Sequence, residues 1–170
     1  MIRHFGSLLM IASLGLLTII YLPVLMAYLP NENKILDSSF DISIPKIDAN
    51  APIIDNVDPW KKSEYEEALK KGVARAKGYH NFLFAHSSLP PWQMTRTNTP
   101  FLRLGELKNG DQIIIHRGGK EYVYKVVGKK EIWPNQVEVL IDSSRDLLIL
   151  QTCTPLGTDL KRLLIFAKLD

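Results

Sequence analysis

The sequence predicts a mainly β domain, a small closed or nearly closed barrel with one or two short helices, preceded by one N-terminal transmembrane helix. Three observations predict this fold. An apolar run covers residues 8–29, most of the remaining chain divides into short segments of strand length, and Gly118-Gly119 separates two of these segments as a hairpin turn would. Many short strands with few helices are typical of small β-barrels.

The composition supports one folded domain with a short accessory segment. The chain has 170 residues, of which 46% are hydrophobic and 23% charged, so it can bury a core and does not resemble a disordered chain. The net charge of +3 is mild. Because nucleic-acid-binding domains usually carry a clustered basic face, we expect no nucleic-acid partner.

The N-terminal segment, residues 1–30, predicts a membrane anchor. No charged residue lies between His4 and Glu32, and about 20 apolar residues suffice for a helix to cross a bilayer. Arg3 precedes the run, so the positive-inside rule predicts a cytoplasmic N-terminus and an extracytoplasmic domain. A cleaved signal peptide is the alternative, but its apolar core usually spans only about 7–15 residues. We therefore expect an uncleaved, single-pass anchor in the cell membrane.

Residues 31–39 are polar and predict a linker to a catalytic domain at 40–170. Alternation of apolar and polar residues predicts a strand at 40–44, and a second short strand is expected at 52–54. An amphipathic helix follows. Its start is assigned to Asp58 as cap with Pro59 in the first turn, or alternatively to a capping box of Ser63 and Glu66. Its apolar face is assigned to core packing and comprises Tyr65, Ala68, Leu69, Gly72 and Val73.

The second half of the domain predicts strands with loops between them. One helical turn is expected at 101–107, ended by Asn109-Gly110. The expected strands are 81–85, 112–117, 120–129, 137–141, 147–152 and 163–169.

The chain has one cysteine, Cys153, so an exported domain cannot form an internal disulfide. A lone cysteine can be an inert buried thiol, an intermolecular bridge or a nucleophile. Cys153 follows an apolar strand and precedes a loop, a position that combines rigid support with open access. We interpret it as a nucleophile.

A reactive thiolate needs positive charge nearby, and two residues can supply it. His86 ends another apolar strand, and Arg162 begins the strand after the cysteine, nine residues downstream, where a short connection returns it beside Cys153. In acyl transfer Cys153 attacks a carbonyl, His86 exchanges protons with the departing and incoming amines, and Arg162 stabilises the oxyanion. Arginine only donates hydrogen bonds, so it cannot be the base.

Each of these residues alone is more often structural, and their combination favours catalysis. Among the other histidines, His80 is expected at a strand entrance, His116 on a solvent-facing hairpin strand, and His4 on the opposite side of the membrane. No acidic cluster predicts a metal site, and we expect no cofactor.

These motifs resemble the signature of sortases. Phe82 to His86 is similar to their strand-ending histidine motif, with Ala85 where glycine is usual. The segments at 101–115 and 40–47 also resemble the family, so the resemblance covers about residues 40–169. The cysteine part of the signature comprises Thr152-Cys153, Thr154-Pro155, Gly157-Thr158 and Arg162-Leu163-Leu164.

The resemblance implies an eight-stranded sortase barrel and a cysteine transpeptidase, a thiol-protease-like enzyme of the cell wall. Its substrate would be a sorting signal similar to Leu-Pro-x-Thr-Gly, cleaved after threonine through a thioester and joined to an amine of the cell wall or a pilin. Loops 87–100, 130–146 and 154–161 would form the walls of its groove. Ser87, Thr152 and Trp133 are candidate substrate-binding residues, and Ile132 with Trp133 is either an apolar wall or core.

Two other functions stay open, as does the subclass. A membrane-anchored cysteine peptidase would act by hydrolysis, although the Gln-Ala-Cys motif of caspases is absent, and a non-catalytic anchored barrel would bind partners. Asp58-Pro59-Trp60 is similar to the lid motif of pilus-building sortases, but it follows the first predicted strand. Because no second apolar segment precedes Asp170 either, we interpret it as a helix start.

Overall fold

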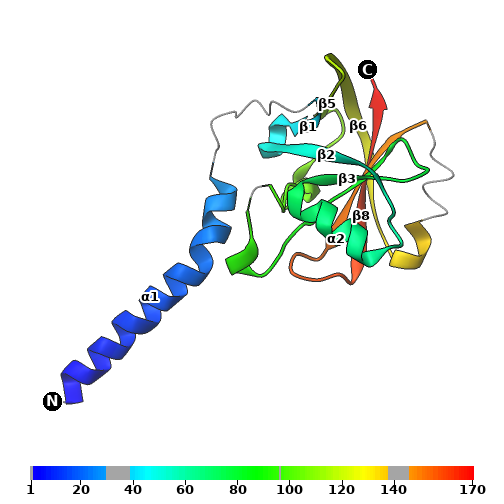
Figure 1. Cartoon of the computed structure of the whole chain (residues 1–170). Helices are drawn as coiled ribbons and strands as arrows, with labels where there is room; N and C mark the ends of the chain where they lie inside the picture. The colour runs from blue at the N-terminus through cyan, green and yellow to red at the C-terminus, as the bar shows by residue number, and fades with distance from the viewer. Residues whose placement is uncertain (1, 30–38, 96, 138–145) are drawn as a thin grey trace.

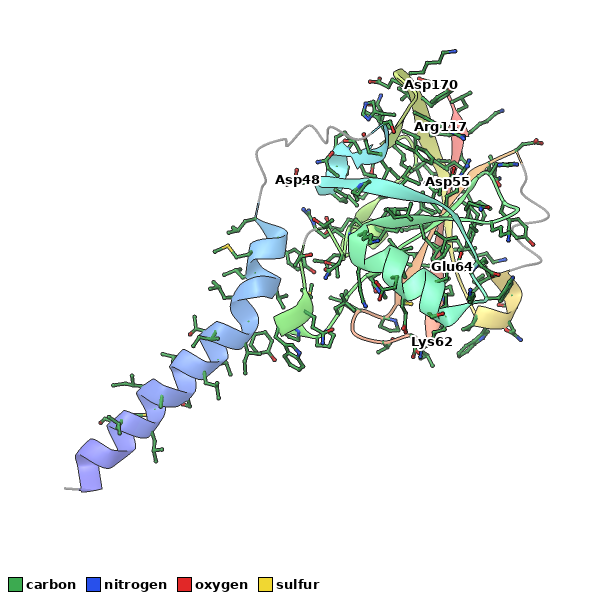
Figure 2. All side chains as sticks on the ribbon, viewed as in Figure 1. Asp48, Asp55, Lys62, Glu64, Arg117 and Asp170 are labelled. Atoms are coloured by element: carbon green, nitrogen blue, oxygen red, sulfur yellow. The ribbon has the colours of Figure 1, made fainter. Side chains whose placement is uncertain are left out.

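The computed structural model describes residues 2–29, 39–95, 97–137 and 146–170. Helix α1 (Ile2–Tyr28) projects from a barrel of strands that carries helix α2 (Lys62–Lys71) on one side (Figure 1). The apolar stretch Gly6–Met26 of α1 is long enough to cross a membrane and is not buried against the rest of the described chain (Figure 2). The predicted arrangement of an apolar N-terminal helix before a mainly β domain is therefore confirmed.

Eight strands close the barrel in the order β1-β2-β3-β4-β7-β8-β6-β5. Closure removes the unpaired edges that an open sheet would expose. The first four strands are β1 (Phe40–Ile44), β2 (Ala49–Val57), β3 (Val73–Ala76) and β4 (Phe82–Phe84). The last four are β5 (Gln112–Arg117), β6 (Lys120–Ile132), β7 (Leu148–Thr154) and β8 (Lys161–Leu169). The described connections between the strands include the 3-10 turns η1 (Pro45–Ile47), η2 (Pro91–Gln93), η3 (Leu104–Glu106) and η4 (Pro134–Gln136).

Two of the strand pairs are parallel, and both bear on the candidate site. β2 and β3 are parallel because α2 provides the crossover between them. β4 and β7 are parallel and far apart in sequence, with Phe84 opposite Gln151. His86 and Cys153 lie two residues beyond Phe84 and Gln151, respectively. The register of this one pair therefore sets the two candidate residues at the same level of the barrel.

The hairpin between β5 and β6 forms at the predicted glycine pair. Gly118 and Gly119 have φ of 57° and 75°, values that L-residues with side chains rarely adopt and that a tight hairpin turn requires. β6 continues to Ile132, beyond the predicted end at residue 129, because its second half pairs with β8.

The core of the domain consists of aliphatic side chains and three phenylalanines, Phe82, Phe84 and Phe101. Burying each such side chain contributes roughly 1.5–3 kcal/mol. Three apolar residues of the predicted helical turn at 101–107, Phe101, Leu104 and Leu107, belong to this core and are fully buried. The largest completely buried side chains are Phe101, Ile42, Ile44, Leu83, Leu104, Leu107, Ile113, Ile149, Leu150, Leu164, Ile165 and Val73.

Helix α2 begins at Lys62, so both predicted helix starts are wrong. The Asp58 carboxylate accepts a hydrogen bond from the backbone N–H of Trp60 at 2.9 Å, which makes residues 58–60 a turn before the helix. The backbone N–H of Asp58 donates to Glu64 Oε1 at 3.1 Å, and no side chain caps the helix at its N-cap residue, Lys61. The Ser63–Glu66 capping box is likewise not formed, because both residues lie inside the helix.

The C-terminal end of the helix also differs from the prediction. Gly72 follows the helix, and Val73 begins β3, a strand that the helical pattern concealed. A Cβ at Gly72 would collide with the carbonyl oxygen of Pro52, so only glycine allows the chain to pass this close to β2. The strand expected at 52–54 is longer and pairs with both β1 and β3. Of the strand predicted at 137–141, residues 138–141 lie outside the described residues.

Candidate active site

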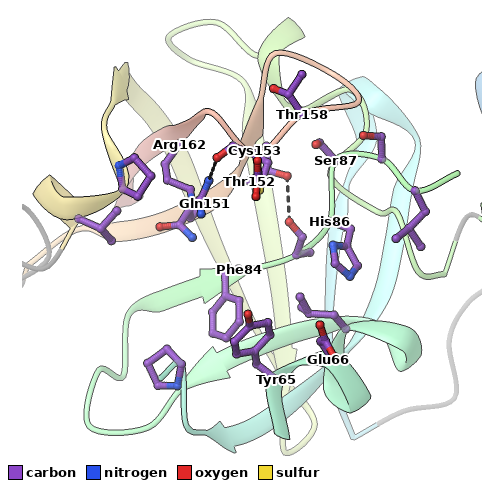
Figure 3. A pocket seen from close by; sticks show the side chains of 18 of the residues that line it. Tyr65, Glu66, Phe84, His86, Ser87, Gln151, Thr152, Cys153, Thr158 and Arg162 are labelled. Carbon is purple, nitrogen blue, oxygen red and sulfur yellow. Dashed lines mark hydrogen bonds between the residues drawn. The ribbon is translucent and has the colours of Figure 1, made fainter. Parts of the chain in front are cut away.

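A cleft of about 840 Å³ opens where β4 and β7 meet α2 and two loops (Figure 3). Its walls include the segment after β4, residues 87–91, and the connection between β7 and β8, residues 157–159. Cys153, His86 and Arg162 all line it. The segment after β4 and two consecutive strands much later in the chain, β7 and β8, therefore contribute the three predicted catalytic residues to one cavity.

Cys153 lies one residue before the end of β7, and its side chain is half-buried with a free thiol. Its strand is held on both sides, by β4 and by β8. In the antiparallel pair with β8, Cys153 stands directly opposite Arg162. Directly opposed residues of neighbouring strands have Cβ atoms about 4.5–5.5 Å apart, so this register places the arginine beside the thiol.

His86 is held level with Cys153 by two hydrogen bonds that continue the β4–β7 ladder. The backbone N–H of Ala85 donates to the carbonyl oxygen of Gln151 at 3.1 Å. The hydroxyl of Thr152 donates to the carbonyl oxygen of Ala85 at 2.9 Å, and the Thr152 side chain is buried (Figure 3). The residue before the histidine and the residue before the cysteine are thus bonded directly to each other.

The Arg162 side chain is oriented by the loop that precedes β8. Its Nη1 donates to the carbonyl oxygen of Asp159 at 2.7 Å and to that of Lys161 at 3.2 Å. In the view of Figure 3, Cys153 lies between Arg162 and the His86 imidazole. A guanidinium group has five N–H donors, so two accepted bonds leave others for a ligand in the cleft.

The cleft disfavours charge on both the thiol and the imidazole. Burial raises the pKa of Cys153 above its ordinary value of 9.0; Arg162 lowers that pKa in part, and Asp159 raises it further. Burial lowers the pKa of His86 below 6.5, and the carboxylate of Glu66 opposes this effect. Near pH 7 the neutral thiol and neutral imidazole therefore predominate, with the thiolate–imidazolium pair as a minor form.

The candidate substrate-binding residues fall in different places. Ser87 is buried and lines the cleft, as does Thr152. Trp133 is not among the residues that line the cleft, whereas its neighbours Pro134 and Val137 are. The Trp133 ring is 51% exposed and lies 5.4 Å from Lys161 Nζ. Ile132 is buried, which favours its assignment to the core over its assignment to an apolar wall of the groove.

The other histidines within the domain lie outside the cleft lining. His80 is exposed, and His116 Nδ1 is 2.7 Å from the Asp41 carboxylate across the β1–β5 pair. The described residues include no group of three or more histidine, cysteine, aspartate or glutamate side chains placed to hold a metal ion, so no metal site is assigned to them.

One wall of the cleft was not predicted from the sequence. Helix α2 contributes Lys62, Tyr65, Glu66 and Leu69, and Trp60 precedes them. The Tyr65 ring packs edge-on against Phe84 of β4, with ring centres 6.5 Å apart. The helical periodicity marks this face correctly as the one that packs on the domain, but periodicity does not distinguish a face that fills the core from a face that borders a cavity.

A hydrogen bond joins the two loops that flank Cys153. The backbone N–H of Gly157 donates to Ser88 Oγ at 2.8 Å, and both residues line the cleft. Gly157 has φ of 81°, a conformation that glycine adopts without strain. The connection links the loop that precedes Arg162 to the segment that follows His86.

The chain is similar to curated sortases of two bacilli. It is 29% identical over 124 residues to sortase A of Bacillus anthracis, an alignment that covers 73% of this chain and 56% of that protein. It is 28% identical over 131 residues to sortase D of Bacillus subtilis, covering 75% and 61% of the two chains. The aligned region thus spans somewhat more than half the length of either relative.

Solved sortase structures share the fold. A lid mutant of sortase A from Corynebacterium diphtheriae superposes with a TM-score of 0.63 at 28% identity, covering 77% of this chain and 69% of that one. Sortase C of Clostridium perfringens, solved with the C-terminal cell wall sorting motif, gives a TM-score of 0.59 at 27% identity, covering 76% and 69%. The family model described as the sortase domain matches residues 42–170, which is most of the chain. The eight-stranded barrel and this match together establish that the chain belongs to the sortase family.

Proposed function

We propose that this protein is a membrane-anchored cysteine transpeptidase that cleaves a Leu-Pro-x-Thr-Gly-like sorting signal and joins the acyl product to a cell-surface amine. The observation that carries the proposal is the meeting of Cys153, His86 and Arg162 in one cleft of a sortase-family barrel. The sorting motif in the Clostridium perfringens sortase C structure supports a peptide of this class as the substrate.

In the first step the Cys153 thiolate attacks the carbonyl carbon of the scissile peptide bond. The carbon–sulfur bond forms, and negative charge develops on the carbonyl oxygen, where Arg162 donates hydrogen bonds. The carbon–nitrogen bond then breaks, and the imidazolium of His86 gives its proton to the departing amine. The products are a thioester on Cys153, a neutral imidazole and a released peptide.

In the second step an acceptor amine reverses this sequence. The amine nitrogen attacks the thioester carbonyl while His86 takes a proton from it. The carbon–sulfur bond breaks, and the thiolate and imidazolium are restored together. A water molecule in place of the amine would give hydrolysis, so the ratio of the two products is set by which nucleophile reaches the thioester.

In this proposal the N-terminal anchor holds the reaction at the cell surface. Gly6–Met26 has the length and composition of a membrane-crossing helix, and Arg3 on its N-terminal side favours a cytoplasmic start. The catalytic domain then faces exported proteins that carry the sorting signal, with cell-wall or pilin amines as acceptors. The linker at 31–39 tethers the domain to the membrane.

The test uses the full chain in detergent micelles with a quenched Leu-Pro-x-Thr-Gly-type peptide, with and without an amine acceptor. We expect an amine-dependent ligation product and, by intact-protein mass spectrometry, a thioester on Cys153. Cleavage by water alone would favour the hydrolytic peptidase. Absence of both turnover and thiol labelling would favour the binding module. Cys153→Ala, shown to be folded by circular dichroism, is the control and should form neither thioester nor product.

A further inference from the structure

Glu66 and His86 border the same cleft from different elements. Glu66 lies on α2, and His86 follows β4. In the view of Figure 3, Glu66 lies below His86, on the side of the imidazole away from Cys153. In that projection the carboxylate, the imidazole and the thiol follow one another, and Glu66 adds a negative charge on the histidine side of the cleft.

Among the charged and titratable groups that line the cleft, Glu66 is the carboxylate on the histidine side. Among the described lining residues the other carboxylate is Asp159, on the β7–β8 connection, and it acts on Cys153. Lys62 Nζ is 3.7 Å from Glu66 Oε1, but the two side chains are 76% and 48% exposed, so solvent weakens this pair. The remaining titratable or charged side chains of the lining are Tyr65, Tyr79, Cys153 and Arg162.

We propose that Glu66 is a positioning residue that acts through His86, its carboxylate favouring the imidazolium that donates a proton to the departing amine. The inference rests on the proposed transpeptidase function. It agrees with the electrostatics of the cleft, since Glu66 raises the pKa of His86 against the larger, opposite effect of burial.

The consequence for catalysis follows from the low population of the thiolate–imidazolium pair. Because burial keeps both groups mostly neutral, the thiolate–imidazolium form is a small fraction of the enzyme. That fraction grows in proportion to the proton affinity of His86. Removing the Glu66 charge should therefore reduce the active fraction by the same factor as it reduces that affinity.

The experiment measures the pKa of His86 directly, by NMR of full-length, histidine-labelled protein in micelles, with His86→Gln identifying the resonance. In Glu66→Gln the pKa should fall by about half a pH unit at low salt, which is roughly a threefold loss of proton affinity. The kcat/KM for the peptide should fall by about the same threefold factor. The matched control is Glu67→Gln, the neighbouring glutamate on the same helix, which pairs with Lys70 at 2.5 Å and does not line the cleft. It should leave the pKa unchanged.

Two further measurements keep the test decisive if Glu66→Gln folds poorly. Lys62→Gln removes the cation that offsets Glu66, so the pKa of His86 should rise. In the wild type, raising the salt from about 0.05 M to 1 M should lower that pKa towards the value of Glu66→Gln, because salt screens exposed charges. An unchanged His86 pKa in Glu66→Gln, or in both of these measurements, would overturn the proposal.

The readouts separate this proposal from the proposed function. A pKa that follows Glu66 in a protein without peptide turnover would refute the transpeptidase and leave the electrostatic coupling standing. Peptide turnover with a His86 pKa that does not depend on Glu66 would support the transpeptidase and refute the electrostatic coupling.

Discussion

The hydroxyl of Thr152 donates a hydrogen bond to the carbonyl oxygen of Ala85 at 2.9 Å, linking the strand of Cys153 to the segment of His86. The two residues immediately precede Cys153 and His86. Thr152 is buried, so the bond lies out of competition with water. Its loss should affect both the stability of the domain and the alignment of the two proposed catalytic groups, Cys153 and His86.

Thr152→Val replaces the hydroxyl with a methyl group of similar size. The Ala85 carbonyl loses its partner, so the free energy of unfolding should fall by about 1–3 kcal/mol. We also expect kcat/KM for the peptide to fall about tenfold, because a small misalignment of catalytic groups is costly. Thr99→Val is the matched control: Thr99 is equally buried and its hydroxyl donates to the Thr95 carbonyl at 2.8 Å, away from the cleft. It should lose similar stability in urea unfolding and keep its kcat/KM.

Arg162→Lys retains a positive charge but loses the planar fork of donors. If Arg162 stabilises the oxyanion, kcat should fall by about a hundredfold or more, with a much smaller change in KM. Steady-state kinetics with the quenched peptide checks this. Arg117→Lys, an exposed substitution at the end of β5, is the control and should be neutral. Equal losses in the two variants would argue against a specific role for Arg162.

The pH dependence of alkylation should report the burial of the nucleophile. Burial raises the pKa of Cys153 above 9.0, so the rate of iodoacetamide labelling should still be rising at pH 9. Arg162 lowers this pKa, so Arg162→Gln should move the labelling curve to still higher pH. A labelling rate that levels off by pH 7 would contradict the assigned environment. The measurement needs no substrate and applies equally if the protein proves to be a hydrolase.

The same two groups should shape the pH profile of catalysis. In the proposed mechanism the active form has a protonated His86 and a deprotonated Cys153, so kcat/KM should be bell-shaped. Its acid limb should lie below pH 6.5, because the pKa of His86 is lowered, and its alkaline limb above pH 9.0. The two apparent pKa values of such a broad profile belong to the coupled pair of Cys153 and His86 and not to either residue alone. A narrow optimum between pH 6 and 7 would be inconsistent with these environments.

His116 should make the stability of the barrel depend on pH. The hydrogen bond to Asp41 raises the pKa of His116 above 6.5, and Glu121 adds to this effect. A raised pKa in the folded state means that the contribution is fully present below the unfolded pKa of about 6.5 and is lost as the pH rises through the folded value. Because the His116 side chain is 42% exposed, the contribution should stay below about 1 kcal/mol.

The measurement is the free energy of urea unfolding of wild type minus His116→Gln between pH 5.5 and 8.5. The difference should shrink as the pH rises, and Asp41→Asn should show the same trend. A difference that grows with rising pH would contradict the assignment. Neither variant should alter kcat/KM by more than about twofold, because His116 lies outside the cleft lining.

Much of the barrel could be predicted from local patterns in the sequence. The apolar N-terminal helix, the glycine hairpin and the strands at 40–44 and 112–117 each have a signal within a few residues. β3 could not be predicted, because Val73–Ala76 is short and becomes a strand only by pairing with β2 and β4. The start of α2 was also misassigned, since the Asp58 carboxylate bonds to the nearby Trp60 N–H and organises a turn instead.

The candidate site, like the fold, could be predicted only in part from the sequence. Cys153, His86 and Arg162 could be proposed because each stands at a strand end, a feature that sequence patterns reveal. Glu66 could not, because its relation to His86 depends on where α2 lies against the barrel. Trp133 is the opposite case. Its position in the predicted loop at 130–146 made it a candidate substrate-binding residue, but it lies beside the cleft lining and not within it.

The closed strand order has a consequence for the order in which the cleft can form during folding. His86 is synthesised well before Cys153 and Arg162. β7 has to pair with β4 on one side and with β8 on the other before the three groups meet. Until that pairing the thiol lacks both neighbours, so we expect an incompletely folded chain to carry an ordinary, unassisted cysteine.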